Sequence, residues 1–357
     1  MTFGPKKKKS KGTFKTRVAE FWKWFPDVAK RFETAAESDD PQEIVAEVGE
    51  FMESTLPGLS WALGRGENGD HSFTLTGEGL VPKQLLAAYW HSQAVELPGW
   101  TFYASRQPSS PETLKDLAIG VSEEEQVDAA NFLVKTTIDE EAEQIDITAW
   151  HPALANVDEE HHFQILFLLL DEALGEFGVQ TWLGEINVEP FTESVGTRSL
   201  LDLPKFIEQA SSYHQWEKYP PLETYSTYEV SEQVSGPRGD TVVGSSCIPE
   251  VIFDYIENDG RATEDMLEDT GAELVYLAID GSVFADGNEV NARTSIEDEL
   301  DDALEEAHSG RTLGGATGSS QSYIDLLLLD GDNSRQIIEQ TLERLQLTSR
   351  CRLINFN

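Results

Sequence analysis

Glycines and hydrogen-bond donors gather in the segment Gly310–Gly318, where a ligand could approach the backbone closely. Four of its nine residues are glycine, so the chain can adopt positive φ angles there without steric cost. Arg311, Thr312 and Thr317 supply donors along the same stretch. We expect a loop that recognises a ligand or partner, and we predict that its binding residues are Arg311, Thr312, Gly314, Gly315, Thr317 and Asp325.

Asp325 belongs to this candidate site because it interrupts the apolar strand predicted over Tyr323–Leu329. In a sheet that is covered on both faces, a carboxylate needs a cationic partner such as Arg311 or Arg293. If one face of the sheet is solvated, Asp325 points to water and needs no partner. The sequence leaves both interpretations open.

No stronger catalytic or nucleotide-binding motif accompanies this segment. Gly314-Gly315-x-x-Gly318 lacks the spacing of the dinucleotide fingerprint, and the sequence contains no phosphate-binding P-loop. The run Gly244–Ile248 begins like a nucleophile elbow but ends in isoleucine where glycine is required. We therefore predict no catalytic residues and no cofactor.

Carboxylates and imidazoles gather at Glu159–His162, with His151 nearby. A zinc-binding helix places its histidines four residues apart, whereas His161 and His162 are adjacent and point about 100° apart on a helix. An acidic helix start, favoured by the helix dipole, explains this cluster, so we predict no metal site. Cys247 and Cys351 are too few for a disulfide framework and are expected to be free thiols at strand edges.

The charge balance of the 357-residue chain restricts its partners. There are 65 acidic and 26 basic residues, giving a formal net charge of −39. Such a field repels phosphate backbones and anionic lipids, which argues against binding to nucleic acid or to a membrane. The acidic surface is expected either to be solvated or to dock a basic partner. The longest apolar block, Phe163–Leu170, is too short to span a bilayer, so we expect a cytoplasmic protein.

The N-terminus has the opposite charge. Residues 1–16 contain lysines at Lys6–Lys9, Lys11 and Lys15 and contain no acid. We expect a disordered, solubilising arm; nuclear targeting and folding back onto the acidic body are the alternatives.

A ββαβ pattern occurs twice in the region assigned to the first domain, residues 17–190, after two amphipathic helices. Each pass has a hairpin, a helix and a tryptophan-containing strand, which favours a duplicated unit that shares one antiparallel sheet. The first pass is expected over 59–65, 71–76, 81–91 and 100–106, and the second over 132–138, 144–150, 159–177 and 179–188. On helix 159–177, one face is formed by Phe163, Leu166, Phe167, Leu170, Leu174 and Phe177.

A connector over 191–239 is expected to lead to a second domain over 240–357. Strands and helices alternate there, which predicts a two-layer sandwich of ferredoxin-like character, with a small three-layer α/β unit as the alternative. The overall class is α+β. The expected elements are strands 240–246, 273–280, 323–329 and 351–357 and helices 249–258, 295–309 and 334–346.

The run Leu313–Gly318 leading into Tyr323-Ile324-Asp325 resembles uncharacterised bacterial proteins classed as domains of unknown function. The strand–helix–strand that follows is similar to the ferredoxin-like domain of the ribonuclease E inhibitor group. This resemblance covers about the last third of the chain and carries over no site residues. It implies a non-catalytic regulatory or binding domain.

The sequence therefore favours a cytoplasmic binding or regulatory protein that recognises another protein. The alternative is a hydrolase or transferase that uses acids near Gly310–Gly318 with Arg311 as an anion clamp; a small-ligand binder or a structural role are further possibilities. A pocket that combines Arg311 with an acid of shifted pKa would favour the enzyme. An exposed apolar patch without a cleft would favour a protein partner. The sequence predicts no oligomeric state.

Overall fold

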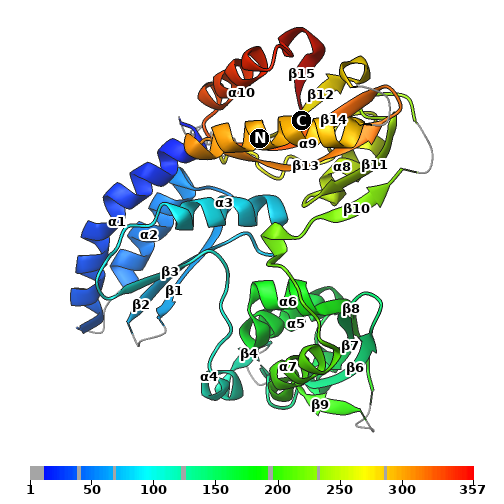
Figure 1. Cartoon of the computed structure of the whole chain (residues 1–357). Coiled ribbons are helices and arrows are strands. Elements are labelled where there is room, and N and C mark those ends of the chain that lie inside the picture. The colour runs from blue at the N-terminus through cyan, green and yellow to red at the C-terminus, as the bar shows by residue number, and fades with distance from the viewer. Residues whose placement is uncertain are drawn as a thin grey trace, which may run out of the picture. The chain divides into compact units, whose positions relative to one another are not determined.

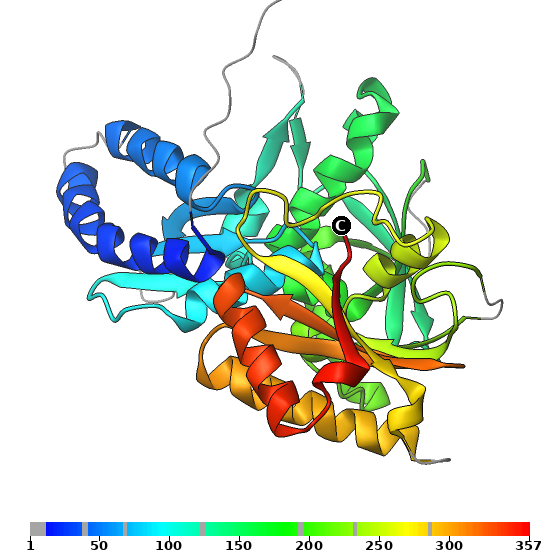
Figure 2. The same ribbon diagram turned by 90° about the horizontal axis from the view of Figure 1, so that it is seen from above.

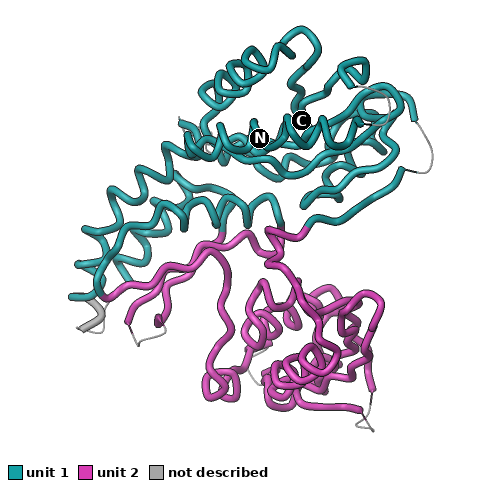
Figure 3. The backbone as a smooth tube through the Cα atoms, viewed as in Figure 1, with its two compact units in different colours: residues 1–59, 81–98, 225–357 teal, residues 60–80, 99–224 magenta. Residues whose placement is uncertain are grey.

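The computed structural model describes residues 12–37, 42–66, 70–121, 126–191, 196–230, 234–284 and 288–357. Helices and strands are both abundant, which confirms the mixed α+β class. The chain divides into two compact units made of interleaved segments (Figure 3). Unit 1 comprises Met1–Leu59, Val81–Pro98 and Tyr225–Asn357, and unit 2 comprises Ser60–Leu80 and Gly99–Thr224.

Unit 1 joins three N-terminal helices to a C-terminal sheet (Figure 1). Trp22 on the first helix stacks on Trp90 of the third at 4.8 Å between ring centroids, so aromatic packing holds these helices together. The helices of this unit are α1 (Phe14–Glu37), α2 (Gln42–Thr55), α3 (Val81–Ser92), α8 (Pro249–Glu257), α9 (Glu289–Glu306) and α10 (Asp332–Arg344).

Six described strands of unit 1 form one antiparallel sheet in the order β10-β11-β13-β14-β12-β15. Helices α9 and α10 lie side by side along one face of it (Figure 2). The strands are β10 (Ser226–Glu229), β11 (Thr241–Ser246), β12 (Glu273–Asp280), β13 (Gly310–Gly318), β14 (Gln321–Leu328) and β15 (Cys351–Asn355).

Both faces of this sheet are covered, because alternate residues of its central strands are buried on opposite sides. Val275 of β12 and Leu326 of β14 pack with Leu300 of α9 in one apolar core. On the other face, Tyr276 of β12 contacts Tyr255 of α8, with 3.1 Å between their hydroxyl oxygens. A polar residue on either face therefore needs a partner within the protein.

The segment expected to be a glycine-rich loop is a strand, so the loop prediction is wrong. Gly310–Gly318 forms β13, which pairs with β11 on one side and β14 on the other. A register shift between Thr312 and Gly314 marks a β-bulge, where Gly314 adopts a φ of 116° that a regular strand does not have. Helix α9 also begins six residues before the predicted position, at Glu289.

Unit 2 contains the two predicted hairpins. In each, the strand that follows the helical segment pairs in parallel with the second hairpin strand, as a crossover connection requires. The predicted single antiparallel sheet is wrong, because the described strands form separate sheets, β1-β2-β3 and β8-β7-β6-β9. The strands are β1 (Ser60–Arg65), β2 (His71–Thr76), β3 (Trp100–Tyr103), β6 (Leu133–Asp139), β7 (Gln144–Trp150), β8 (Leu183–Val188) and β9 (Thr197–Ser199).

The long helix expected over 159–177 is two helices in the structure. Gly175, at φ 73°, ends α5 (Glu159–Leu174) and leads into α6 (Glu176–Trp182). A Cβ at this position would lie 2.9 Å from Pro108 Cδ, so glycine permits both the turn and the close approach. The smaller elements of unit 2 are α4 (Pro111–Asp116), α7 (Leu203–His214), β4 (Ala118–Gly120) and β5 (Gln126–Asp128).

The compact units differ from the expected division at residues 190 and 240. The backbone N–H of Phe14 donates to Gly271 O at 3.0 Å, and that of Lys15 donates to Leu329 O at 2.9 Å, so α1 belongs with the C-terminal sheet. The expected arm over 1–16 also ends early, because α1 begins at Phe14. Residues 1–11, with their lysines, lie outside the described residues. Independent folding of 240–357 stays a prediction.

Candidate functional site

The six predicted binding residues lie on the central hairpin of unit 1, but their side chains serve different contacts. Thr312 is buried and donates from both its backbone N–H and its hydroxyl to Asp301 Oδ1, at 2.6 and 2.9 Å. Thr317 is half-buried beside the end of β13, paired in register with Ser322. Arg311 lines a pocket, whereas Asp325 is enclosed in the sheet.

Asp325 forms an ion pair with Arg238, and both side chains are fully buried. Arg238 Nη2 also donates to the hydroxyl of Tyr228 at 3.3 Å, so residues of β14 and β10 together orient the guanidinium. The sequence correctly required a cation if both faces of the sheet were covered. Its two suggested partners, Arg311 and Arg293, were not the residue that makes the ion pair.

Aromatic rings surround this buried pair. The guanidinium carbon of Arg238 lies 4.8 Å from the ring centroid of Tyr323 and 5.1 Å from that of Tyr276. Burial raises the pKa of the Asp325 carboxyl, and the neighbouring Arg238 acts in the opposite direction. Burial also raises the pKa of Tyr228 to about 12, so its hydroxyl stays protonated at neutral pH. The arrangement is an internal support of the sheet without contact to solvent.

A sequence signal for Arg238 existed. It is the only lysine or arginine between Lys218 and Arg261. A lone cation in an acidic stretch and a lone acid in an apolar strand each mark a candidate for a buried pair, but the sequence does not connect the two. The next acid, Asp240, accepts from the hydroxyl of Tyr323 and from the backbone N–H of Ser320 at 2.9 Å. Both charged residues of the sequence Arg238-Gly239-Asp240 are thus engaged by contacts within unit 1.

The adjacent glycines are explained by close packing within the sheet. Gly314 has φ 116°, and a Cβ there would lie 2.1 Å from the carbonyl oxygen of Ser245. A Cβ on Gly315 would lie 2.4 Å from Tyr323 O and 3.0 Å from Nη1 of Arg293. Both positions exclude side chains because neighbouring protein atoms fill the space, so the glycines do not require a ligand.

Arg311 faces a pocket of about 410 Å³ within unit 1. One face of α3 forms a wall, and the end of α9 and strands β13 and β14 form the others. Arg311 Nε donates to Thr312 O at 3.3 Å, and its side chain also hydrogen-bonds the hydroxyl of Tyr225. No ion pair between described residues involves its guanidinium. The lining residues are Leu85, Ala88, Tyr89, Ser92, Gln93, Glu305, His308, Gly310, Arg311, Leu327 and Leu329.

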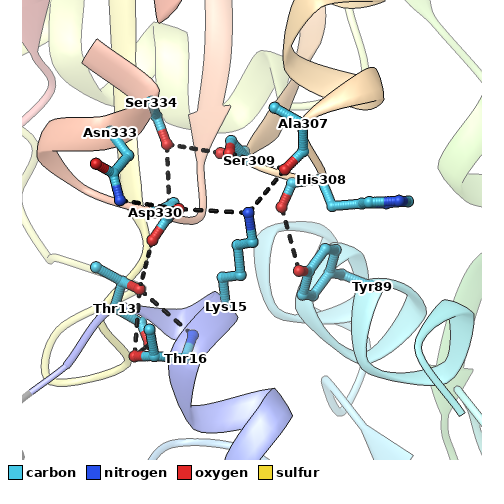
Figure 4. A network of polar contacts seen from close by, with 10 residues as sticks. All are labelled: Thr13, Lys15, Thr16, Tyr89, Ala307, His308, Ser309, Asp330, Asn333 and Ser334. Atoms are coloured by element: carbon cyan, nitrogen blue, oxygen red, sulfur yellow. Dashed lines mark hydrogen bonds and ion pairs between the residues drawn. The ribbon is translucent and has the colours of Figure 1, made fainter. Parts of the chain in front are cut away.

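A polar network beside this pocket fixes its walls (Figure 4). Tyr89 donates its hydroxyl to His308 O at 3.2 Å, and Lys15 Nζ donates to Ala307 O at 2.7 Å. Lys15 Nζ also lies 3.4 Å from a carboxylate oxygen of Asp330, which accepts from Thr13 as well. Burial, with a contribution from Asp330, raises the pKa of Tyr89 to about 12. These contacts hold α1 and α3 against the end of α9.

The clearest exposed apolar surface among the described residues lies on α5 of unit 2. Phe163, Phe167 and Leu168 are 47%, 40% and 38% exposed, and we call these three residues the α5 patch. The two phenylalanine rings stack with centroids 6.5 Å apart. The opposite face of α5 packs into the core of unit 2 through Ile165, Leu166, Leu169, Leu170 and Ala173. The face expected from periodicity, Phe163 to Phe177, is therefore divided between solvent and core.

Acidic residues lie at both ends of α5. Asp158, Glu159 and Glu160 are exposed at its start. Near its end, burial, with Glu176 as the next cause, raises the pKa of Asp171 to about 7, while Arg106 acts in the opposite direction. Glu176 itself is buried and accepts from Thr76 Oγ1 at 2.5 Å and from Gly79 N at 2.9 Å.

The histidines near α5 do not combine into one site. His162 is buried, with Nε2 2.9 Å from the carbonyl oxygens of both Leu154 and Val157, while His151 Nε2 lies 3.4 Å from Asp128. Ligand atoms of Asp158, Glu160 and His161 lie within 4.8 Å of one another, all on exposed side chains. This exposed group is consistent with the acidic helix start that the sequence predicts.

Comparisons with known proteins do not extend this description. In the part of the chain that the structure describes, no helix combines the length and apolar character needed to cross a membrane. No protein-family model, curated protein or solved structure was found to match the chain.

Proposed function

We propose that this chain is a non-catalytic cytoplasmic binding protein that recognises another protein through the α5 patch. The observation that carries the proposal is the exposure of two stacked phenylalanines and a leucine on a helix whose opposite face is already buried. Exposed aromatic side chains gathered on one rigid element are typical of interaction surfaces. Because α5 packs into its own core, partner binding needs no rearrangement of the helix.

The partner that fits this patch is an amphipathic helix with basic residues beside its apolar face. Phe163 and Phe167 of the α5 patch are spaced i, i+4, so they lie one turn apart on one face of α5, against which the apolar face of a second helix can pack. Exposed Asp158, Glu159 and Glu160 flank it, within a chain of net charge −39. Charge complementarity therefore favours lysine and arginine on the partner and disfavours a second copy of this acidic chain.

For the architecture, we propose that residues 273–355 form a ferredoxin-like βαββαβ unit extended by β10 and β11. The chain order β12-α9-β13-β14-α10-β15 and the antiparallel strand order β13-β14-β12-β15 support this assignment. The same fold is implied by the resemblance to the ribonuclease E inhibitor group, where it is a non-catalytic domain. The free thiols of Cys247 and Cys351 support a reducing compartment.

The alternative function, a hydrolase or transferase with Arg311 as an anion clamp, has less support. Asp325, an acid of this hairpin whose pKa is raised by burial, does not line the Arg311 pocket. Ser92 does line it, but its hydroxyl donates to Tyr89 O at 2.7 Å. Among the described residues, no hydrogen bond joins Ser92 to His308, so this histidine does not activate the Ser92 hydroxyl.

The proposal is tested with a fluorescent amphipathic helix made of leucine and lysine as the probe. Fluorescence anisotropy with the whole chain should show saturable binding. The double variant Phe163→Gln/Phe167→Gln should weaken it by about tenfold or more, because it removes the apolar anchors. Glu159→Gln/Glu160→Gln should weaken it less and reduce its dependence on salt.

Two controls separate the patch from the general negative charge. Val290→Gln removes an exposed apolar side chain on α9, 54% exposed, and should leave binding unchanged. A leucine–glutamate helix with the same apolar spacing should not bind. Equal binding of the lysine helix to the wild-type chain and to the double phenylalanine variant would contradict the proposal.

A further inference from the structure

The Arg311 pocket is a second candidate binding site, in unit 1, that the proposed function does not use. Its lining combines apolar side chains from α3 and β14 with a guanidinium from β13. Leu85 and Leu327 are buried beneath it, and Arg311 pairs in register with Leu327 across the hairpin. A cation thus borders an apolar surface in a cavity large enough for one small molecule.

The guanidinium of Arg311 has no carboxylate partner of its own among the described residues. Asp301, on the neighbouring helix, accepts instead from Thr312 N and Thr312 Oγ1. Two other arginines of unit 1 are paired with acids: Arg335 Nη2 lies 2.5 Å from Glu273 and Arg344 Nη1 lies 2.7 Å from Glu299. In a chain with 65 acids and 26 bases, the Arg311 guanidinium contacts the neutral hydroxyl of Tyr225 instead of a carboxylate, so its charge remains available to an external anion.

An acidic residue in the pocket lining favours an anion with a single negative charge. Glu305 also lines the pocket and opposes the entry of a dianion such as phosphate. One carboxylate satisfies the planar fork of an arginine with two parallel hydrogen bonds. The apolar lining from Leu85, Ala88 and Leu327 then accommodates a hydrocarbon tail.

We propose that the Arg311 pocket binds a small monocarboxylate with an apolar tail, its carboxylate on Arg311 and its tail against α3 and β14. The hydrogen bond from Tyr89 to His308 O and the ion pair of Lys15 with Asp330 keep the pocket walls in place around it (Figure 4). The ligand is held by charge and apolar burial, and no covalent step is involved.

The probe is hexanoate, and its binding to the whole chain is measured by saturation-transfer NMR. Hexanoate should bind with a Kd of about 1 mM, the range expected for so small a ligand, and hexan-1-ol should bind at least about tenfold more weakly. Arg311→Gln should weaken hexanoate binding by about tenfold, and Ala88→Phe should abolish it by filling the cavity. Arg344→Gln, which removes a cation from the surface of α10, should leave it unchanged.

Each alternative result has a definite meaning. Equal binding of hexanoate and hexan-1-ol would overturn the role of Arg311, and this comparison needs no variant. Hexanoate binding that persists in folded Arg311→Gln would do the same, with folding checked by circular dichroism. Displacement of hexanoate by an equal concentration of inorganic phosphate would overturn the preference for an apolar monoanion. If the wild-type chain bound the leucine–lysine helix but not hexanoate, the proposal for the Arg311 pocket would be overturned and the proposed function would stand.

Discussion

The β13–β14 hairpin and helix α5 reverse the roles that their sequences indicate. The hairpin has the glycines, donors and lone acid of a ligand site, yet most of these residues make their contacts with other residues of unit 1. Helix α5 has the continuous apolar character of a core element, yet three of its large side chains face solvent. Polar residues in a buried strand indicate hydrogen bonds and ion pairs within the protein. Apolar residues on the solvent-facing side of a helix indicate a surface that a partner could cover.

The largest expected effect tests whether the hairpin is structural. Asp325→Ala leaves Arg238 buried without its carboxylate, so the free energy of unfolding should fall by about 3–5 kcal/mol. Chemical denaturation monitored by circular dichroism measures this loss. Glu339→Ala, at an exposed acid on α10, is the control and should change stability by less than about 0.5 kcal/mol. A small loss for Asp325→Ala would mean that the pair does not support the sheet.

The glycines of β13 should give the next largest effect. Gly314→Ala and Gly315→Ala place a Cβ against neighbouring atoms, and each should lower the free energy of unfolding by about 1–3 kcal/mol. Gly120→Ala is the matched control, because nothing lies within 4 Å of a Cβ there, and it should be nearly neutral. Thermal unfolding compares the three variants. Tolerance of alanine at both positions would reopen the interpretation of this segment as a ligand site.

The next prediction concerns Asp171, near the end of α5, whose ionisation should lower the free energy of unfolding. Its pKa is raised to about 7 in the folded state from an ordinary value of 3.8, so folding favours the protonated form. The stabilisation from this proton is complete below pH 4 and is lost as the pH rises through 7. Asp171→Asn should therefore stabilise the protein at pH 8, by about 1–2 kcal/mol after allowance for solvent screening, and have little effect at pH 4. Denaturation at the two pH values measures the difference, and equal effects at both would contradict it.

The smallest effect is expected on the α5 patch itself. Phe163→Gln and Phe167→Gln should change the free energy of unfolding by less than about 0.5 kcal/mol, because both rings are already substantially exposed. Leu166→Ala, one position away and fully buried, should lower it by about 2–5 kcal/mol. If the phenylalanine variants lose as much stability as Leu166→Ala, the patch is part of the core.

The sequence predicted local elements better than their associations. The hairpins, the helix predicted over 81–91 and the strand over 273–280 follow from periodicity and capping, which act over a few residues. The pairing of Asp325 with Arg238 depends on positions 87 apart, and periodicity carries no information at that range. The spacing of the glycines also could not show whether a ligand or neighbouring backbone lies against them, because either one requires a position without a Cβ.

The division of α5 illustrates the same limit. When apolar residues surround most of a helix, the sequence does not indicate which side is buried. That side is determined by the sheet against which the helix packs. Leu166 and Leu170 meet that sheet, and Phe163 and Phe167 do not. The continuous run Phe163–Leu170, with Gln164 inside it, was the available signal that one side would remain exposed.

The docking of α1 on the C-terminal sheet has a consequence for synthesis on the ribosome. Thr13 meets Asp330 across 317 positions, and Arg17 meets the carbonyl of Asp269 across 252. At translation rates of about 5–20 residues per second, α1 waits roughly 15–60 s for its docking site. Meanwhile Phe14, fully buried in the finished protein, lacks the backbone carbonyl of Gly271 to which its N–H donates, although all of unit 2 has been translated. Nascent chains halted before β12 should therefore recruit chaperones at α1, and release should coincide with emergence of β14.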